Sequence, residues 1–307
     1  MTGRPHQAVP ATVTTPASLF VQRWGSGRPV VFLHGLGASY RYWARLAQLG
    51  SGYAGIAPDL LGFGHSPEPP ESTYDVAAHL EMLLPVIPDG AVIVGHSAGA
   101  VLAAGVAAAR PAGVAGLLLL GLPAFSDDTT ARDHIRHLGL LPRLTVDGTT
   151  GAKLICHAMC ALRPLLRRLG PKLADLPPEV ASDFFARTWP SYSGTLPQVV
   201  VGHRVLPDLL AARTPTVLVG AWDDRDAPPR HLLSADQALV GAGLSATLRV
   251  VNGDHHLSVR QPMLVEGLLE GILDRFPAED LAGFETSRRL SATATTEPQT
   301  SPRPPAP

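Results

Sequence analysis

The residue with the clearest chemical potential is a serine between two glycines. Ser97 lies in the pattern G-x-S-x-G, which spans Gly95–Gly99. The apolar run Ala91–Val94 precedes the pattern and the alanine-rich stretch Ala98–Ala109 follows it. A strand-turn-helix context of this kind is what the pattern needs to present a reactive hydroxyl. We therefore predict that Ser97 is a nucleophile, with a glycine-flanked serine in an ordinary turn as the alternative.

A second glycine-rich turn could stabilise negative charge. His34–Gly37 reads H-G-x-G and directly follows the apolar run Pro29–Leu33. Glycines let a backbone approach a substrate closely, so we predict that the backbone N–H groups of Leu36 and Ala98 hold the oxyanion of a tetrahedral intermediate. The alternative is a plain turn in which His34 has a structural role.

A serine hydroxyl is a weak nucleophile at neutral pH and needs an adjacent base, which is usually histidine. The sequence contains 12 histidines. His255 and His256 follow the last strand-like run, Thr247–Val251, and are therefore expected at the same sheet edge as Ser97. Residue type and position leave both histidines open as the base.

The base in turn needs a carboxylate that holds its tautomer and orientation. Asp223, Asp224 and Asp226 follow the strand-like run Thr216–Val219, at the same predicted edge. A solvated acidic turn is the alternative interpretation, and it must apply to two of the three carboxylates.

The elements that position these residues follow an alternating pattern. Short apolar runs alternate with helical periodicity, which predicts an α/β fold with a mostly parallel central sheet flanked by helices. The predicted strands are Pro29–Leu33, Ala54–Ala57, Ala91–Val94, Val114–Leu120, Thr216–Val219 and Thr247–Val251. The predicted helices are Tyr40–Leu49, Val76–Leu84, Ala98–Ala109, Pro229–Val240 and Met263–Phe276.

One long interval interrupts the alternation. Residues 125–212 contain helix-like pieces without a convincing buried strand, which predicts a helical cap over the strand ends. The core is then predicted over 17–124 and 213–276, with a flexible N-terminus at 1–16 and a disordered tail at 277–307. The helix-like pieces of the predicted cap include Ala131–Leu138, Ala152–Leu169 and Glu179–Thr188.

Together these motifs resemble the α/β-hydrolase superfamily, from about Phe20 to Phe276. The chain order of serine, aspartate and histidine is also the order found in that superfamily. The resemblance implies a helical cap inserted after strand 6 of the family's count. The local patterns that carry it are Val31–Gly37, Pro58–Ser66, Gly95–Gly99 and Gln261-Pro262.

The resemblance also implies which base and acid are used. In the family the catalytic histidine usually lies seven positions before a helix-opening proline, and counting back from Pro262 gives His255. The acid commonly lies in a D-x-x-x-P pattern, which Asp224 forms with Pro228, whereas another part of the family pattern fits Asp223. Asp224 is thus the implied acid and Asp223 the alternative acid.

Composition narrows the classes of partner. The formal net charge is −1, the sequence pI is about 6.9 and the charged fraction is 17%, so no nucleic-acid partner or anionic membrane surface is indicated. Two cysteines cannot form a disulfide scaffold, and we find no secretory signal and no apolar run long enough to span a bilayer. We expect a cytoplasmic protein with a small-molecule substrate, and leave open whether it forms a homo-oligomer.

These features predict a serine hydrolase that cleaves a small, largely apolar carboxylic ester through an acyl-enzyme intermediate. The predicted chemistry requires no metal and no organic cofactor. Two alternatives remain: a hydrolase of carbon–carbon bonds in products of aromatic breakdown, and a non-catalytic ligand-binding protein with the same fold.

Overall fold

The computed structural model describes residues 18–50, 52–148, 150–162, 178–186 and 188–275. The predicted flexible N-terminus, 1–16, and the predicted disordered tail, 277–307, lie outside these residues. None of the described helices is long and apolar enough to cross a membrane.

A seven-stranded sheet lies at the centre, in the order β1-β3-β2-β4-β5-β6-β7. Only β1 runs antiparallel to its neighbour, β3, and every other neighbouring pair is parallel. The mostly parallel sheet predicted from the sequence is therefore confirmed. The strands are β1 Val21–Gly25, β2 Arg28–Leu33, β3 Tyr53–Pro58, β4 Ala91–His96, β5 Val114–Leu120, β6 Thr216–Ala221 and β7 Ala246–Val251.

The six predicted strands correspond to β2 through β7, and only β1 is missing from the prediction. Gln22 and Arg23 in the middle of β1 are exposed, so this edge strand has no continuous apolar run. The central strands are buried on both faces, as parallel strands between two helix layers must be. All six residues of β4, for example, are buried.

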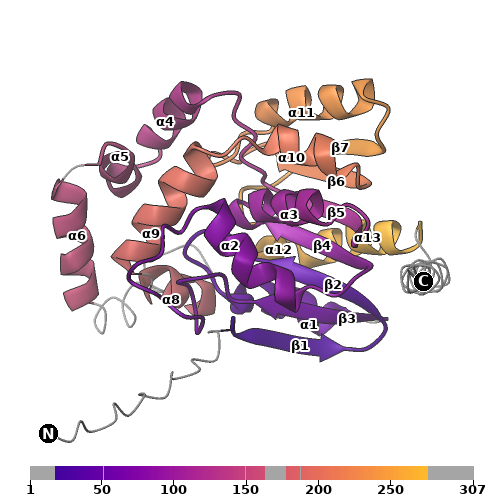
Figure 1. Ribbon diagram of the computed structural model, residues 1–307, viewed down its shortest axis with the longest axis horizontal. Coiled ribbons are helices and arrows are strands. Elements are labelled where there is room, and N and C mark those ends of the chain that lie inside the picture. The colour runs from indigo at the N-terminus through magenta and orange to yellow at the C-terminus, as the bar shows by residue number, and fades with distance from the viewer. Residues whose placement is uncertain (1–17, 51, 149, 163–177, 187, 276–307) are drawn as a thin grey trace, which may run out of the picture.

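Helices cover both faces of the sheet (Figure 1). Successive residues of β2 point to opposite layers: Val31 and Leu33 pack with α2, α3, α10 and α11, whereas Val30 and Phe32 pack with α1, α12 and α13. The first layer comprises α2 Val76–Leu83, α3 Ala98–Ala109, α10 Val205–Ala212 and α11 Arg230–Gly241. The second comprises α1 Ala44–Leu49, α12 Leu257–Arg260 and α13 Pro262–Leu273. Two short 3-10 helices, η1 Tyr40–Trp43 and η2 Leu84–Val86, complete the connections.

A helical segment separates β5 from β6, in the interval predicted to form the cap. Figure 1 shows α4, α5 and α6 standing apart from the sheet at one end of the molecule. The last helix of the interval, α10, packs instead against α3 in the layer that covers the sheet. The elements of the segment are α4 Asp128–Arg136, α5 Leu140–Val146, α6 Thr150–Ala161, α8 Pro178–Ala186, α9 Trp189–Thr195, the π-helix η3 Leu196–Val201, and α10.

The position of this segment depends on how the strands are counted. Among the described residues, the helical segment follows the fifth strand, Val114–Leu120. The family count assigns number six to the strand Val114–Leu120, but among the described residues only four strands precede it. The chain order of strand, helical segment and strand is otherwise as predicted.

Candidate active site

Ser97 has the backbone conformation of a strained turn. Its φ is 54° and its ψ is −121°, between the end of β4 and the start of α3. A non-glycine residue in that region costs about 1–3 kcal/mol and persists only where the surroundings enforce it. Here the Ser97 N–H donates to the carbonyl of Leu120 at the end of the neighbouring strand, at 2.9 Å. The turn therefore holds the serine at the carboxyl edge of the sheet.

Two glycines make this turn possible by close approach of the backbone. A Cβ on Gly95 would lie 2.6 Å from the Cα of Ala100 in the first turn of α3. A Cβ on Gly99 would overlap the carbonyl oxygens of Leu33 and His34 at the end of β2. A Cβ on Gly95 would also lie 2.7 Å from the carbonyl oxygen of Gly99, so the glycines of the motif let α3 pack closely on the strands and on each other's backbone.

The predicted oxyanion loop lies directly against the serine. A Cβ on Gly35 would lie 3.1 Å from the Ser97 Cβ, so a side chain has no room there. In the described residues, the N–H groups of Leu36 and Ala98 donate to no backbone carbonyl in a turn or loop. A backbone amide that donates to no carbonyl can bind developing negative charge.

His34 has the structural role that was the alternative interpretation. Its ring is fully buried, Nδ1–H donates to the carbonyl of Gly35 at 2.8 Å, and Nε2 accepts the Leu60 N–H at 3.0 Å. Burial also lowers the pKa of His34. A neutral ring that bridges two loops fixes the shape of the oxyanion loop.

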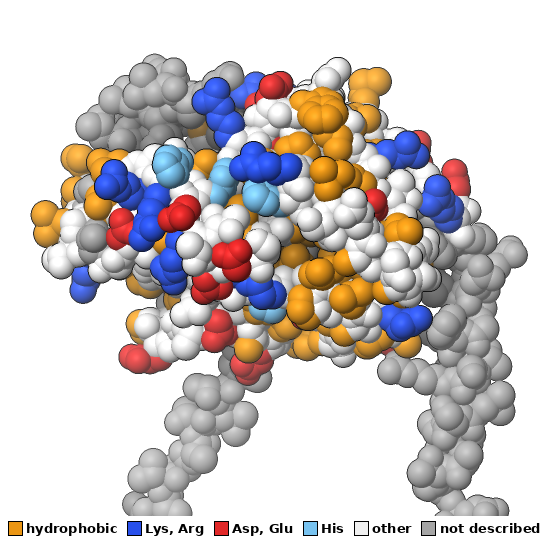
Figure 2. All heavy atoms as spheres, turned by 90° about the horizontal axis from the view of Figure 1, so that it is seen from above, with side chains coloured by type: hydrophobic (Ala, Val, Ile, Leu, Met, Phe, Trp, Pro, Cys, Tyr) orange, Lys and Arg blue, Asp and Glu red, His pale blue; other side chains and the backbone are white. Residues whose placement is uncertain are grey.

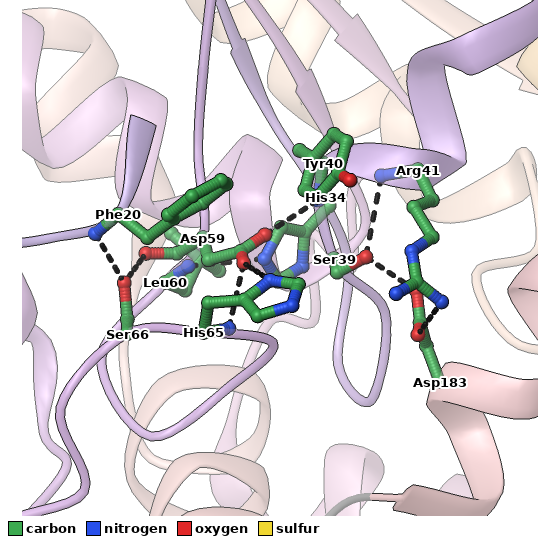
Figure 3. Close-up of polar contacts among 10 residues, drawn as sticks. All are labelled: Phe20, His34, Ser39, Tyr40, Arg41, Asp59, Leu60, His65, Ser66 and Asp183. Carbon is green, nitrogen blue, oxygen red and sulfur yellow. Dashed lines mark hydrogen bonds and ion pairs between the residues drawn. The ribbon is translucent and has the colours of Figure 1, made fainter. Parts of the chain in front are cut away.

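A buried carboxylate extends this support (Figure 3). Asp59, after β3, is fully buried and accepts the N–H groups of Tyr40 at 2.6 Å and His65 at 2.8 Å. The backbone carbonyl of Asp59 accepts a hydrogen bond from the Ser66 hydroxyl at 2.6 Å. The hydroxyl oxygen of Ser66 in turn accepts the Phe20 N–H at 3.0 Å. Buried charge is tolerated only where hydrogen bonds compensate it, so this network specifies the loops around it.

Helix α8 is fastened to the same region by an acidic side chain (Figure 3). Asp183 accepts a hydrogen bond from the Ser39 hydroxyl and pairs with the Arg41 guanidinium at 3.1 Å. Burial raises the pKa of the Asp183 carboxyl, against the opposing effects of Ser39 and Arg41. One helix of the predicted cap is therefore linked to the turn that follows the oxyanion loop.

The structure separates the two candidate acids. The Asp224 side chain is 1% exposed and its two oxygens lie 3.0 and 2.9 Å from His255 Nδ1. Its Oδ1 also accepts the N–H groups of Asp226 at 2.9 Å and Ala227 at 2.8 Å. Asp223 is exposed. Asp224 thus contacts the predicted base, and Asp223 is not brought to it.

The structure also separates the two candidate bases. A Cβ on Gly121 would lie 3.0 Å from His255 Cε1, and the residue before it, Leu120, accepts the Ser97 N–H. His255 and Ser97 therefore lie against adjacent residues at the end of β5. Burial, together with the nearby His255, lowers the pKa of His256 to about 4.

The electrostatics of His255 suit a base that becomes charged. Burial lowers its pKa, but the hydrogen bond to Asp224 and the charges of Asp224, Asp226 and Asp254 outweigh burial, so that its pKa lies above the ordinary 6.5. Because Nδ1–H donates to Asp224, the lone pair of the neutral ring is on Nε2. Nε2 is therefore the ring nitrogen that can accept a proton.

Asp224, Asp226 and His255 are also the three described residues whose ligand atoms lie within 4.8 Å of one another, as a metal site would require. However, both Asp224 oxygens contact His255 Nδ1, and Oδ1 accepts two amides. The arrangement as it stands orients an imidazole.

A surface hollow lies near this site without containing the serine. It measures about 560 Å³ and lies between α4 and the loop that joins β6 to α11. Figure 2 shows this face, where histidine side chains lie among those of arginine and lysine. His134 donates from Nε2 to the Arg225 carbonyl at 2.8 Å and so links α4 to the loop that carries Asp224. Asp224 lines the hollow but Ser97 does not, so the hollow lies on the outer side of the acid.

Sequence reasoning missed one buried residue of the site. His96, which precedes Ser97, is 3% exposed, stacks on Tyr42 at 4.5 Å and lies 2.7 Å from the carbonyl oxygen of His255. The motif leaves this position unspecified, so only its place beside the serine could have drawn attention to it.

Comparison with known proteins agrees with this fold. A model of the family described as the alpha/beta hydrolase family matches residues 30–266. The chain therefore belongs to the α/β-hydrolase family. An esterase structure from Thermogutta terrifontis has the same fold, with a TM-score of 0.62 and 20% identity over 86% of this chain and 96% of that chain.

Two curated relatives match part of the chain. The lipase LipV of Mycobacterium tuberculosis is 41% identical over 121 residues, which are 38% of this chain and 46% of that protein. The probable lysophospholipase BODYGUARD 2 of Arabidopsis thaliana is 38% identical over 105 residues, which are 31% of this chain and 22% of that protein. The chain thus spans less than half the length of either relative.

Proposed function

We propose that the protein is a serine hydrolase that cleaves a small, largely apolar carboxylic ester. The observation that carries the proposal is the pairing of buried Asp224 with His255 Nδ1 at 2.9 Å, beside the strained turn at Ser97. This combination is the arrangement by which enzymes activate a serine hydroxyl. The names of the relatives, a lipase and a probable lysophospholipase, favour an ester bond as the target.

The proposed reaction proceeds in two halves. In the first half, Ser97 Oγ attacks the ester carbonyl while His255 Nε2 accepts the hydroxyl proton. The N–H groups of Leu36 and Ala98 stabilise the oxyanion, and His255 then protonates the leaving alcohol, which leaves an acyl group on Ser97. In the second half, His255 deprotonates a water that attacks the acyl carbonyl, and the acid is released as Ser97 regains its proton. Asp224 stabilises the imidazolium in both halves.

Each oxyanion donor is expected to lower the activation barrier of the reaction. Loss of one oxyanion donor typically costs about 3–4 kcal/mol, which is about 100- to 1000-fold in rate. The backbone strain at Ser97 supports the proposal, because such strain is concentrated at functional sites, where the surrounding structure enforces it. All of these groups belong to the polypeptide itself.

The proposal is tested with p-nitrophenyl butyrate and a fluorophosphonate probe. We expect turnover of the ester by the wild-type protein, covalent labelling located at Ser97 by mass spectrometry, and loss of both in Ser97→Ala. The matched control is Ser234→Ala, on the exposed surface of α11, which should retain both activities. Equal turnover by wild type and Ser97→Ala, or a folded wild type that neither turns over nor labels, would contradict the proposal and favour ligand binding without catalysis.

A further inference from the structure

The side chain of His96 connects the serine turn with the segment that carries His255. His96 is the last residue of β4, and Ser97 is its direct neighbour. His96 Nε2 lies 2.7 Å from the carbonyl oxygen of His255, on the loop after β7. In the sheet, β5 and β6 lie between β4 and β7. The contact therefore bridges two intervening strands with a single side chain.

The partner of Nε2 fixes the protonation of the ring. A carbonyl oxygen only accepts hydrogen bonds, so Nε2 must carry a proton. Burial and the neighbouring His255 and His256 hold the pKa of His96 well below 6.5, so the ring carries no second proton. Its Nδ1 is buried and has no hydrogen-bond partner among the described residues. His96 is thus a neutral donor to one backbone carbonyl.

Packing leaves this ring a single position. On one side it stacks on buried Tyr42, with ring centroids 4.5 Å apart and planes 16° from parallel. On another side is the oxyanion loop, where a Cβ on Gly35 would lie 2.8 Å from His96 Nδ1. The ring of His255 lies 4.6 Å away, centroid to centroid. The same side chain therefore contacts the oxyanion loop and the base, and is covalently next to the nucleophile.

We propose that His96 is a positioning residue that holds the backbone of His255 at the correct distance from Ser97. The inference rests on the proposed function. Asp224 sets the direction of the His255 ring through Nδ1, but it does not fix where the backbone of residue 255 lies. The Nε2–H of His96 supplies that second constraint. Because serine and histidine come from strands that are not neighbours, small shifts of the β7 loop would otherwise change the distance over which the proton moves.

The test compares His96→Leu with His96→Gln. Leucine fills space but cannot donate, whereas the glutamine amide can donate to the same carbonyl. We expect His96→Leu to lower kcat for p-nitrophenyl butyrate by about 100-fold with KM within about twofold, since a displacement near 1 Å has an effect of that size. The rate of fluorophosphonate labelling should fall by the same factor. His96→Gln should restore most of both.

The control is His137→Leu. His137 also hydrogen-bonds to a backbone carbonyl, that of Asp133 at 2.6 Å, but it is exposed on the segment after α4 and should retain wild-type kcat. Wild-type kcat in folded His96→Leu would overturn the inference, as would a His96→Gln variant no better than His96→Leu. Both outcomes leave the proposed function intact, because the wild type still labels and turns over.

A measurement on the wild type keeps the inference testable if either His96 variant fails to fold. Nitrogen-15 NMR of the imidazole rings reports which ring nitrogen carries the proton. We expect His96 to be neutral, with the proton on Nε2, at pH 7. A proton on Nδ1, or a charged ring, would overturn the inference even in a protein that shows no turnover.

Discussion

Replacement of Asp224 by asparagine should reverse the tautomer of His255. Oδ1 of Asp224 accepts two backbone amides, from Asp226 at 2.9 Å and Ala227 at 2.8 Å. In Asp224→Asn the two backbone N–H groups still need an acceptor, so the side-chain oxygen of the asparagine stays in the place of Oδ1. The new NH₂ group must then occupy the place of Oδ2, which lies 2.9 Å from His255 Nδ1. An NH₂ group cannot accept the Nδ1 proton. The ring is therefore forced to carry its proton on Nε2. That nitrogen can then no longer accept the proton of the Ser97 hydroxyl.

The size of the effect follows from that reversal. A serine enzyme whose base is held in the wrong tautomer loses about 10⁴-fold in kcat, which corresponds to about 5.5 kcal/mol of barrier. The variant also loses the charge that keeps the pKa of His255 above 6.5. Neutral His255 is the active form of the free enzyme, so kcat/KM of the wild type rises with pH through this pKa. In Asp224→Asn the acid limb should move to lower pH while the plateau falls.

The assay is kcat/KM for p-nitrophenyl butyrate between pH 5 and pH 9, with Asp223→Asn as the matched control. Asp223 is the neighbouring carboxylate and is exposed, so its variant should stay within about twofold of wild type, as surface substitutions usually do. The reasoning is refuted if Asp224→Asn keeps more than about a tenth of the wild-type kcat, which the wrong-tautomer argument does not allow. An equal loss in Asp223→Asn would refute the assignment of the acid.

Two further predictions concern stability. Gly99→Ala should destabilise the protein by about 1–3 kcal/mol or more in urea unfolding, because its Cβ would overlap the carbonyl oxygen of Leu33. Gly267 lies in the middle of α13, and a Cβ added there would meet no neighbouring atom within 4 Å, so Gly267→Ala should stabilise the protein by about 0.5–1 kcal/mol. Equal effects of the two substitutions would contradict the packing argument. Burial raises the pKa of Asp183 above 3.8 despite its pairing with Arg41, so this carboxyl adds stability at low pH that is lost as pH rises through its folded pKa. Urea unfolding should therefore show the stability of wild type relative to Asp183→Asn falling as pH rises above 3.8, and a rising difference would contradict the sign of the shift.

The sequence predicts most of the sheet because parallel strands buried on both faces must be apolar. Val114–Leu120, for example, coincides with β5 at both ends. The strand Val21–Gly25 could not be predicted in this way, since an edge strand needs no apolar run. Its pairing with β3 depends on contacts between segments that are far apart in the chain.

The turn at Ser97 was predictable, because a tight turn admits few residue types and fixes their spacing. The choice between Asp223 and Asp224 is of another kind, since adjacent residues of one type differ only in burial and in what they contact. The structure brings Asp224 to His255 and leaves Asp223 exposed. His96 lay beyond pattern reasoning because its partner, the carbonyl of His255, is a backbone atom that any sequence would supply.

The place where the chain leaves the sheet has a consequence for how such a protein can diversify. β5 and β6 are hydrogen-bonded parallel neighbours, with Leu117 paired to Thr216, so the segment between them leaves at the carboxyl end of β5 and returns to the amino end of β6. Closing a loop between two fixed points costs only about 0.6 kcal/mol more each time its length doubles. Residues can be added or removed between these strands while the register on which Ser97, Asp224 and His255 depend stays the same. The helical segment can therefore change in length and shape while the strand ends that carry these three residues keep their arrangement.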